Sequence, residues 1–455
     1  MAKRVQKRAV VQDQKLRKKL FLVACTVLLV KFVLILSIKD GGWLGADGEN
    51  YLTGLNGLLK SGFASKEPLL NYWPAGYPLL LWMLSFISIS KLIYLISFTQ
   101  SILYFVATAF FVERIRLTRL SKLAMPLAVI LGFNPTLSLS SLAVGYESAV
   151  ASCFLLTTAL IIRYQQNQNR KNFYQTLVLV GLIQGISAFM QPRGILLGII
   201  IFILWGLFNG GWKNIATTVV IGSVIVMIFP AVLVVRNVQA NNTATISTNL
   251  GSTMNGGAGD KATGGYPGRG NTNYGVPCTP KPPATTVSDS RLVGCVISWY
   301  LKHPGKTAVL VVKKSVYFWS PWYGPLANGT MARNPWLKID PIRNIASNQQ
   351  GHSLVFGPFG KIISWIWFIS SLFLLFYGFG WLWRAGGVER QLSVLSGTPI
   401  LLAWLISVAT IGDHRYRLPT MGLSLFLQVC GYFGLRERFS KTQKPLALEP
   451  HGRTR

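Results

Sequence analysis

Acidic side chains are scarce in this sequence. Asp and Glu number 14 against 45 Lys and Arg, and charged residues make up only 13% of the 455 residues. An average soluble protein carries about 25% charged residues. Hydrophobic residues make up 51% of the chain. This composition excludes an ordinary soluble domain.

Several common functional motifs are also missing. Cysteine and histidine number only five and four, and no group of them has the spacing of zinc ligands. Gly305-Lys306-Thr307 resembles the end of a P-loop, but Tyr300 stands where that motif needs its first glycine. The Gly-rich stretch 239–290 is neither preceded by a strand nor followed at once by a helix, so a dinucleotide site is excluded and irregular structure is predicted. No internal repeat is found, which counts against transporters built from duplicated halves.

Long apolar runs, in contrast, recur along the chain. A helix needs about 20 such residues to cross a bilayer. The predicted crossings are 20–38, 93–112, 122–141, 147–163, 174–190, 194–208, 214–235, 361–383, 392–410 and 418–435. Gly76–Ile89 is apolar but too short to cross, so it either lies in the interface or dips in and returns. The expected fold class is an all-α polytopic membrane protein with about ten transmembrane helices.

Basic residues gather on one side of this topology. They crowd residues 1–19, recur in Arg114–Lys122 and Arg163–Lys171, and return in 436–455. Cytoplasmic connections of membrane proteins are enriched in Lys and Arg. We therefore predict a multi-pass protein of the plasma (inner) membrane with both termini in the cytoplasm. The net charge of +31 is assigned to contact with the lipid bilayer rather than with nucleic acid.

This orientation divides the chain into inner and outer segments. The segments are a basic tail (1–19), a transmembrane module (20–235) with a first outer loop (39–92), an outer Gly/Thr-rich region with amphipathic helices (236–360), C-terminal transmembrane helices (361–435) and a second basic tail (436–455). Cys278 and Cys295 both fall in the outer region, and a disulfide between them would suit an oxidising compartment.

Any carboxylate base on the outer side must come from nine residues that the topology places outside or at the outer boundary, namely Asp40, Asp47, Glu49, Glu67, Glu147, Asp260, Asp289, Asp340 and Asp413. Asp47 and Glu49 are the best placed of these. Asp47 and Glu49 follow the first crossing, and Glu147 begins the fourth. A solvated acidic turn is the structural alternative for the first two, and an acid favoured by the helix dipole is the alternative for Glu147. Lys31 lies within the first predicted helix, where its long stem is expected to snorkel towards the interface.

Five short motifs follow one another along the predicted outer face. They are Asp47 with Tyr51, the stretch Trp73–Pro78 that contains Tyr77, Arg236-Asn237, Ser247–Asn249 with Ala262–Tyr266, and Arg415–Pro419. In these motifs the chain resembles the GT-C membrane glycosyltransferases, in particular the protein O-mannosyltransferase and lipid-A aminoarabinose transferase group and its bacterial relatives. That group typically carries Asp-Glu-x-x-Tyr after its first helix. Here Gly48 replaces the Glu, and an acid stands at Glu49 instead.

The resemblance implies a GT-C-like bundle and an inverting transfer of a sugar from a polyprenyl-phosphate donor. The acceptor would be a hydroxyl of a glycan, lipid or protein, and neither a cofactor nor a metal would be required. Asp47 is the expected general base. The residues expected to bind donor or acceptor are Glu49, Tyr51, Tyr77, Glu147, Arg236, Asn237, His414, Arg415, Tyr416 and Arg417. Arginine suits bidentate phosphate contact, but anchoring of helices at the headgroups is an alternative role, and the favoured one for Arg193.

Two other classes of function remain open. A glycan ligase or polymerase with a lipid-diphosphate donor would also combine many crossings with a large outer loop and arginines. A transporter or flippase would need ionisable residues deep in the bundle, and the predicted crossings hold few of them.

Overall fold

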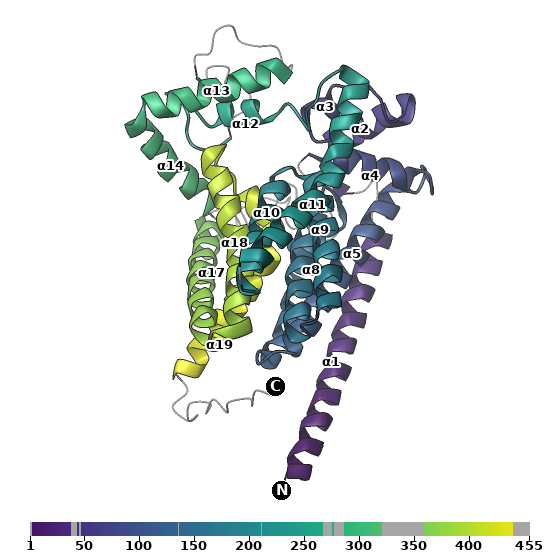
Figure 1. Cartoon of the computed structure of the whole chain (residues 1–455), viewed down its shortest axis with the longest axis vertical. Coiled ribbons are helices and arrows are strands. Elements are labelled where there is room, and N and C mark those ends of the chain that lie inside the picture. Colours follow the sequence, from purple (N-terminus) through teal and green to yellow (C-terminus); the bar gives the residue numbers. More distant parts are fainter. Residues whose placement is uncertain are drawn as a thin grey trace.

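The computed structural model describes residues 2–37, 43–44, 47–134, 136–210, 212–266, 275–276, 286–320 and 358–439. Within these ranges the protein is a bundle of helices crowned at one end by a group of shorter helices (Figure 1). Its only strands in the described ranges are two residues each, paired in parallel.

Helices correspond to all ten predicted crossings. They are α1 (Ala2–Leu36), α5 (Leu92–Arg116), α6 (Ala124–Phe133), α8 (Glu147–Gln166), α9 (Arg170–Met190), α10 (Arg193–Phe208), α11 (Trp212–Asn241), α17 (Pro358–Ala385), α18 (Gly387–Ala409) and α19 (Met421–Phe439). Eight candidate spans in the described part of the chain are long and apolar enough to cross a membrane, whereas α6 and α10 are shorter apolar helices. The all-α polytopic fold class is confirmed.

Large apolar side chains face outward from these helices. Phe21 on α1 is 72% exposed and Ile366 on α17 is 62% exposed. Such a face is unfavourable in water but matches the hydrocarbon layer, in which a helix also satisfies its own backbone hydrogen bonds. The outward face is therefore the lipid-facing surface of the bundle.

The predicted crossing 122–141 is interrupted, unlike the prediction. A 3₁₀ turn at Ser121–Leu123 leads into α6, which ends before Asn134, and a separate short helix α7 (Leu137–Ser140) follows. The Asn134 Oδ1 atom accepts hydrogen bonds from the backbone N–H groups of Thr136 and Leu137 at 3.0 and 2.8 Å. The sequence places Pro135 at this point, and proline disfavours helical backbone in the residue before it. The apolar run is thus long enough, but the helix ends at Phe133, before the proline.

The two ends of the bundle differ in structure. At one end α1 begins and α19 ends, and at the other lie α2 (Gly48–Ser61), α3 (Leu69–Tyr72), α12 (Leu250–Gly256) and α13 (Thr286–Lys302) (Figure 1). The short apolar run after residue 75 forms α4 (Gly76–Ser85), which stops after ten residues and does not cross. We call these two ends the basic end and the crown.

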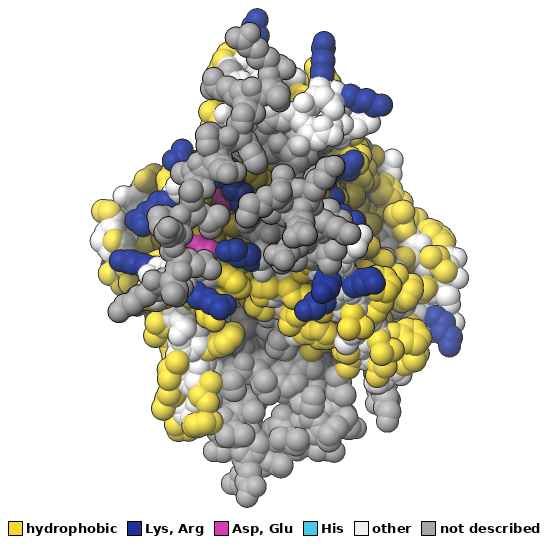
Figure 2. Space-filling view, turned by 90° about the horizontal axis from the view of Figure 1, so that it is seen from below, with side chains coloured by type: hydrophobic (Ala, Val, Ile, Leu, Met, Phe, Trp, Pro, Cys, Tyr) yellow, Lys and Arg dark blue, Asp and Glu magenta, His cyan; other side chains and the backbone are white. Residues whose placement is uncertain are grey.

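Exposed cations gather at the basic end, which is viewed from below in Figure 2. They stand in the first or last turns of helices and in the connections between them, namely Arg119, Lys122, Arg163, Arg170, Lys171, Lys213, Arg384, Arg390, Arg436 and Arg438. This is the pattern that the positive-inside rule associates with a cytoplasmic face.

Glycines bring parts of the crown close together. Residues Leu250–Gly256 form the helix α12, so the prediction of irregular structure throughout 239–290 is wrong at this point. Gly251 on α12 lies against α13, where its backbone N–H donates to Asp289 Oδ1 at 2.7 Å. A Cβ atom on Gly251 would come within 2.5 Å of the Asp289 carbonyl oxygen. Glycine here serves close packing of two helices rather than a flexible loop.

A lysine is buried where the crown meets the bundle. Lys314 on α14 (Pro304–Phe318) is 1% exposed. Its Nζ atom donates to the Thr410 carbonyl at 2.7 Å, the Val408 carbonyl at 3.1 Å and the Tyr300 hydroxyl at 2.8 Å. Burial lowers the pKa of Lys314 to about 8, because the charged form loses its hydration.

The stability of the protein should therefore rise with pH in a window set by Lys314. Between its folded pKa of about 8 and the ordinary value of 10.5, the unfolded chain binds a proton that the folded protein has lost, so the free energy of unfolding increases with pH. Each unit of pKa difference contributes about 1.4 kcal/mol. Thermal unfolding in detergent should show this rise in the wild type and not in Lys314→Met. Lys313 is the exposed neighbour and serves as the control, so the Lys313→Met variant should show the same increase in stability with pH as the wild type.

The C-terminal helices depend on a close crossing of α17 and α19. A Cβ atom on Gly378 would lie 1.9 Å from the Leu427 carbonyl oxygen, whereas a Cβ on Gly380 of the same helix would meet nothing within 4 Å. We expect Gly378→Ala to lower the free energy of unfolding by about 1–3 kcal/mol, because the backbone of α17 or α19 must move to make room for the new Cβ atom. Gly380→Ala should be neutral or stabilising by about 0.5–1 kcal/mol, since alanine favours the helix. Equal unfolding temperatures of the two variants would contradict this packing.

Candidate functional site

A short strand pairing brings two distant carboxylates to one place. Strand β1 (Trp43–Leu44) runs parallel to β2 (Ala143–Val144), with Leu44 opposite Val144. Three residues beyond this pair stand Asp47, at the N-cap position of α2, and Glu147, the first residue of α8. Parallel chains leave a pairing at the same edge, so the two acids emerge side by side at two helix N-termini, where the dipole favours negative charge.

Buried polar side chains hold β2 and the segment before it in position. On α5, the Ser97 hydroxyl donates to the Leu142 carbonyl at 2.6 Å, and the Gln100 side chain donates to the Ala143 carbonyl at 2.9 Å. The Nζ atom of Lys31 donates to the carbonyl of Ser138 and the hydroxyl of Ser141, both at 2.7 Å. Lys31 is 3% exposed, so the expectation that it snorkels is wrong.

An ion pair joins Asp47 to the connection between α18 and α19. Arg415 Nη1 lies 3.0 Å from Asp47 Oδ2, and the two side chains are 22% and 17% exposed. Arg415 Nε lies 3.4 Å from Asp413 Oδ2, and the Arg415 backbone N–H donates to Asp413 Oδ1 at 2.8 Å. One guanidinium therefore stands between two carboxylates that still contact solvent.

The short helix that carries Arg415 sends neighbouring side chains in different directions. Helix η3 (His414–Thr420) is a 3₁₀ helix, and its three residues per turn separate consecutive side chains by about 120°. Arg415 reaches Asp47, while the Tyr416 ring lies under the guanidinium of Arg193, whose carbon is 3.8 Å from the ring centroid. Arg417 donates to the Ser320 carbonyl at 2.6 Å. Helix η3 thus connects the N-terminal module with the C-terminal helices.

Three tyrosines lie beside the ion pair. The rings of Tyr51 and Tyr77 are 5.0 Å apart edge to face, and Tyr146 lies 6.0 Å from Tyr51. The Tyr77 hydroxyl accepts a hydrogen bond from the Gly145 N–H at 2.9 Å. Burial raises the pKa of Tyr51 well above its usual value; Tyr146, Glu147 and Asp47 raise it further, and Arg415 lowers it. The charges of Glu147, Asp47 and Arg415 therefore all act on the Tyr51 hydroxyl, so these groups lie near one another.

A narrow cavity opens beside Arg417. Its volume is about 80 Å³, and its lining includes Trp319, Trp367, Phe368 and Gln428. The guanidinium carbon of Arg417 lies 4.6 Å from the centroid of the Phe368 ring. Its Nε atom is buried and has no hydrogen-bond partner in the described part of the chain. The cavity thus combines one cation with an aromatic wall.

Two of the predicted site residues lie elsewhere. Arg236 is fully buried, and its guanidinium donates to the carbonyls of Leu70, at 3.2 Å, and Ser65. The Asn237 side chain donates to the Thr245 carbonyl at 2.7 Å. These contacts tie the end of α11 to the crown, and the structure does not bring the two residues to the Asp47–Arg415 pair.

The remaining predicted residues divide by exposure. Glu49 lies in the first turn of α2 with an exposed side chain. His414 begins η3 next to Arg415 and is partly buried. Cys295 on α13 is disulfide-bonded, and Cys278 lies outside the described residues. The roles predicted for Glu49 and His414 stay predictions.

The structure adds Asp413, Tyr146 and Arg193 to the site. Asp413 and Tyr146 each stand within two residues of a predicted site residue, so their place next to the motifs was an available signal. Arg193, at the start of α10, contacts Tyr416 by its guanidinium, in addition to any anchoring role. In the described ranges no three His, Cys, Asp or Glu side chains group as a metal site would require.

Comparison with known proteins gives distant matches only. No protein-family model and no curated protein matches the chain. Solved structures of an archaeal oligosaccharyltransferase resemble it. AglB from Archaeoglobus fulgidus, in complex with an inhibitory peptide and a dolichol-phosphate, is 12% identical at a TM-score of 0.45, covering 92% of this chain and 52% of that chain. The Archaeoglobus fulgidus oligosaccharyltransferase tethered with an acceptor peptide containing the NVT sequon is 12% identical at a TM-score of 0.46, covering 91% and 50%.

The chain therefore spans about half the length of these structures.

The Asp47–Arg415 contact should be energetically significant because it is partly buried. In a double-mutant cycle with Asp47→Asn and Arg415→Gln, we expect a coupling free energy of about 1–3 kcal/mol in unfolding measurements. The ion pair of Lys306 with Asp260 is the control. Its Nζ and Oδ1 atoms are 2.6 Å apart, but its side chains are 56% and 64% exposed. Exposed pairs contribute about 0.2–1 kcal/mol. A coupling no larger than that of the control would contradict the proposed importance of the pair.

Proposed function

We propose that this protein is a membrane glycosyltransferase of the GT-C type. It transfers a sugar from a polyprenyl-phosphate donor to an acceptor hydroxyl at the crown, with inversion at the sugar carbon. The observation that carries the proposal is the partly exposed Asp47, held by Arg415 beside Tyr51 and Glu147. The order of the five motifs along the sequence, from Asp47 to Arg415, also supports a GT-C-type glycosyltransferase.

Asp47 is the proposed general base. Its carboxylate accepts the proton of the acceptor hydroxyl while that oxygen forms a bond to the anomeric carbon. The bond from this carbon to the donor's phosphate oxygen breaks at the same time, and the electron pair leaves with the polyprenyl phosphate. The phosphate leaves without being protonated, so a single base is sufficient. Attack from the side opposite the phosphate inverts the sugar carbon.

Arg415 is the proposed positioning partner of this base. Its contact at 3.0 Å fixes the orientation of the Asp47 carboxylate. The second carboxylate, Asp413, holds the same guanidinium in place. Because both members of the pair are partly exposed, an acceptor hydroxyl can approach the Asp47 oxygen from the solvent side.

Arg417 and its cavity are the proposed site of the lipid phosphate. A guanidinium with an unused buried Nε–H is suited to stabilise the charge that develops on the leaving phosphate. The aromatic wall next to it is apolar enough to contact the first isoprene units. Arg193, over the Tyr416 ring, supplies a second cation near the same helix.

The orientation follows from the distribution of charge. The exposed cations of the basic end favour the cytoplasm, so the crown and the Asp47 site face outside a plasma (inner) membrane. On this side nucleotide sugars are scarce, and a lipid-linked donor is the simpler supply.

The second candidate is transfer from a lipid diphosphate, as in a glycan ligase or polymerase. Three guanidiniums lie on or beside η3, those of Arg193, Arg415 and Arg417. Three cations favour a diphosphate donor, because a diphosphate carries more negative charge than a monophosphate. Transfer that persists without any outer carboxylate would select this candidate.

Replacement of the proposed base tests the function. Asp47→Asn should lower the rate of glycosyl transfer by about 10²–10⁴-fold, the usual contribution of a general base. The assay is mass spectrometry of glycans and lipids from cells that lack the protein and are complemented with each variant. Glu67→Gln removes another crown carboxylate and should retain transfer. Full activity of a folded Asp47→Asn protein would exclude the proposed mechanism.

A further inference from the structure

A second cavity lies at the basic end, remote from the Asp47 site. Its volume is about 290 Å³, and it is formed by the last turns of α5 and α8 and the first turns of α9. Small-molecule pockets have volumes of roughly 300–1,000 Å³, so the space is close to that of a small ligand. Nothing in the proposed transfer reaction uses it.

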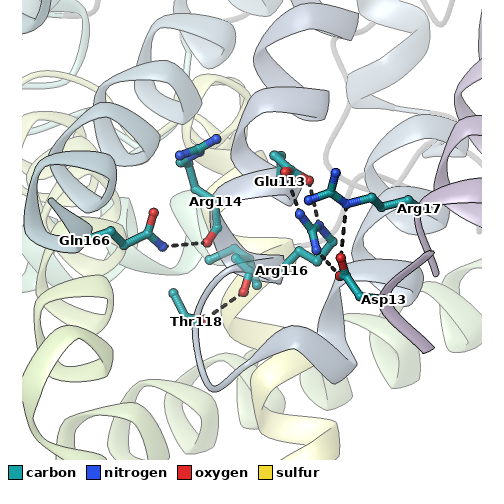
Figure 3. A network of polar contacts seen from close by, with 8 residues as sticks. Asp13, Arg17, Glu113, Arg114, Arg116, Thr118 and Gln166 are labelled. Atoms are coloured by element: carbon teal, nitrogen blue, oxygen red, sulfur yellow. Dashed lines mark hydrogen bonds and ion pairs between the residues drawn. The ribbon is translucent and has the colours of Figure 1, made fainter. Parts of the chain in front are cut away.

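Two arginines line this cavity. The Arg114 Nε atom is buried and has no hydrogen-bond partner in the described part of the chain. Figure 3 shows its guanidinium directed away from the neighbouring network, in which Arg116 pairs with Glu113 at 2.8 Å and with Asp13. The second arginine, Arg163, is exposed, and its positive charge repels that of Arg114. Two like charges next to each other are unfavourable unless an anion lies between them.

The rest of the lining is polar on one side and apolar on the other. The amide side chains are those of Gln166, Asn167, Asn172 and Gln175, and the apolar ones include Leu117 and Leu179. None of the residues that line the described cavity is an aspartate or glutamate. Leu117 and Leu179 are 46% and 43% exposed, so the apolar side of the cavity opens to the surface of the bundle.

We propose that this cavity binds a phosphate oxyanion, supplied by the headgroup of an anionic phospholipid in the adjacent leaflet. Arg114 and Arg163 contact the phosphate oxygens, since guanidinium groups match phosphate geometry. Asn167 and Gln175 line the same side of the cavity and face the rest of the headgroup, whereas the Gln166 and Asn172 side chains donate to the carbonyls of Arg114 and Asn167 and so hold the cavity wall in place. The exposed leucines at the rim contact the acyl chains. A soluble phosphate ester shares the oxyanion but would make no use of the rim.

Lipid retention by the full-length protein tests the proposal. The purified protein is mixed with equal amounts of phosphatidylglycerol and phosphatidylcholine in detergent, and bound lipid is measured by native mass spectrometry. The wild type should retain phosphatidylglycerol preferentially. The double variant Arg114→Gln/Arg163→Gln should lower its bound fraction by at least about tenfold, as expected for loss of charge-assisted hydrogen bonds.

The control removes the same charge from the same end. Arg119 and Arg170 are exposed and do not line the cavity, so Arg119→Gln/Arg170→Gln should retain the lipid. An equal loss in both double variants, or no lipid preference in the wild type, would overturn the proposal. If the first double variant fails to fold, Arg163→Gln alone, at an exposed position, should reduce retention in the same direction.

Competition with inorganic phosphate distinguishes the two sources of the oxyanion. Retention of phosphatidylglycerol in the presence of excess inorganic phosphate supports the lipid headgroup. Displacement of the lipid by phosphate would overturn the assignment to a lipid and identify a site for soluble phosphate instead.

Discussion

The partly buried ion pair between Asp47 and Arg415 is the contact on which the candidate site at the crown depends. It joins residues 368 positions apart, one at the start of α2 and the other on η3. Away from bulk water an ion pair is stronger than on the surface, and the loss of one partner leaves an uncompensated charge. Because η3 also carries Tyr416 and Arg417, the orientation of one short helix fixes the carboxylate, the stacked arginine and the aromatic cavity together.

The two ends of the bundle use charge in different ways. At the crown, the carboxylates of Asp47 and Asp413 lie against one guanidinium, that of Arg415. At the basic end, exposed cations outnumber acids, and a basic surface of this kind attracts anionic lipid. The hydrophobic helices between the ends separate the proposed chemistry from the proposed lipid contact.

Much of this arrangement could be predicted from the sequence, and the exceptions have physical causes. Asp47 and Arg415 were selected as separate motifs, and the structure places them in contact. Arg236 was selected on the same grounds, but its two terminal nitrogens donate to the carbonyls of Leu70 and Ser65 and it contacts no residue of the Asp47–Arg415 pair. Lys31 was expected at the interface because a lone cation in an apolar helix usually snorkels. Its acceptors lie on α7 and the residue after it, 107 and 110 positions away, and no local pattern reveals such partners.

The sequence by itself determined the class of fold, the ten apolar segments and the unequal charge of the two ends, because these depend on composition and on the length needed to cross a bilayer. Only the tertiary structure decided which polar groups meet. The pairing of Leu44 with Val144 aligns Asp47 with Glu147, and the three-residue period of η3 separates Arg415 from Arg417. Both results depend on contacts between segments far apart in the chain, and short-range preferences carry no information about such contacts.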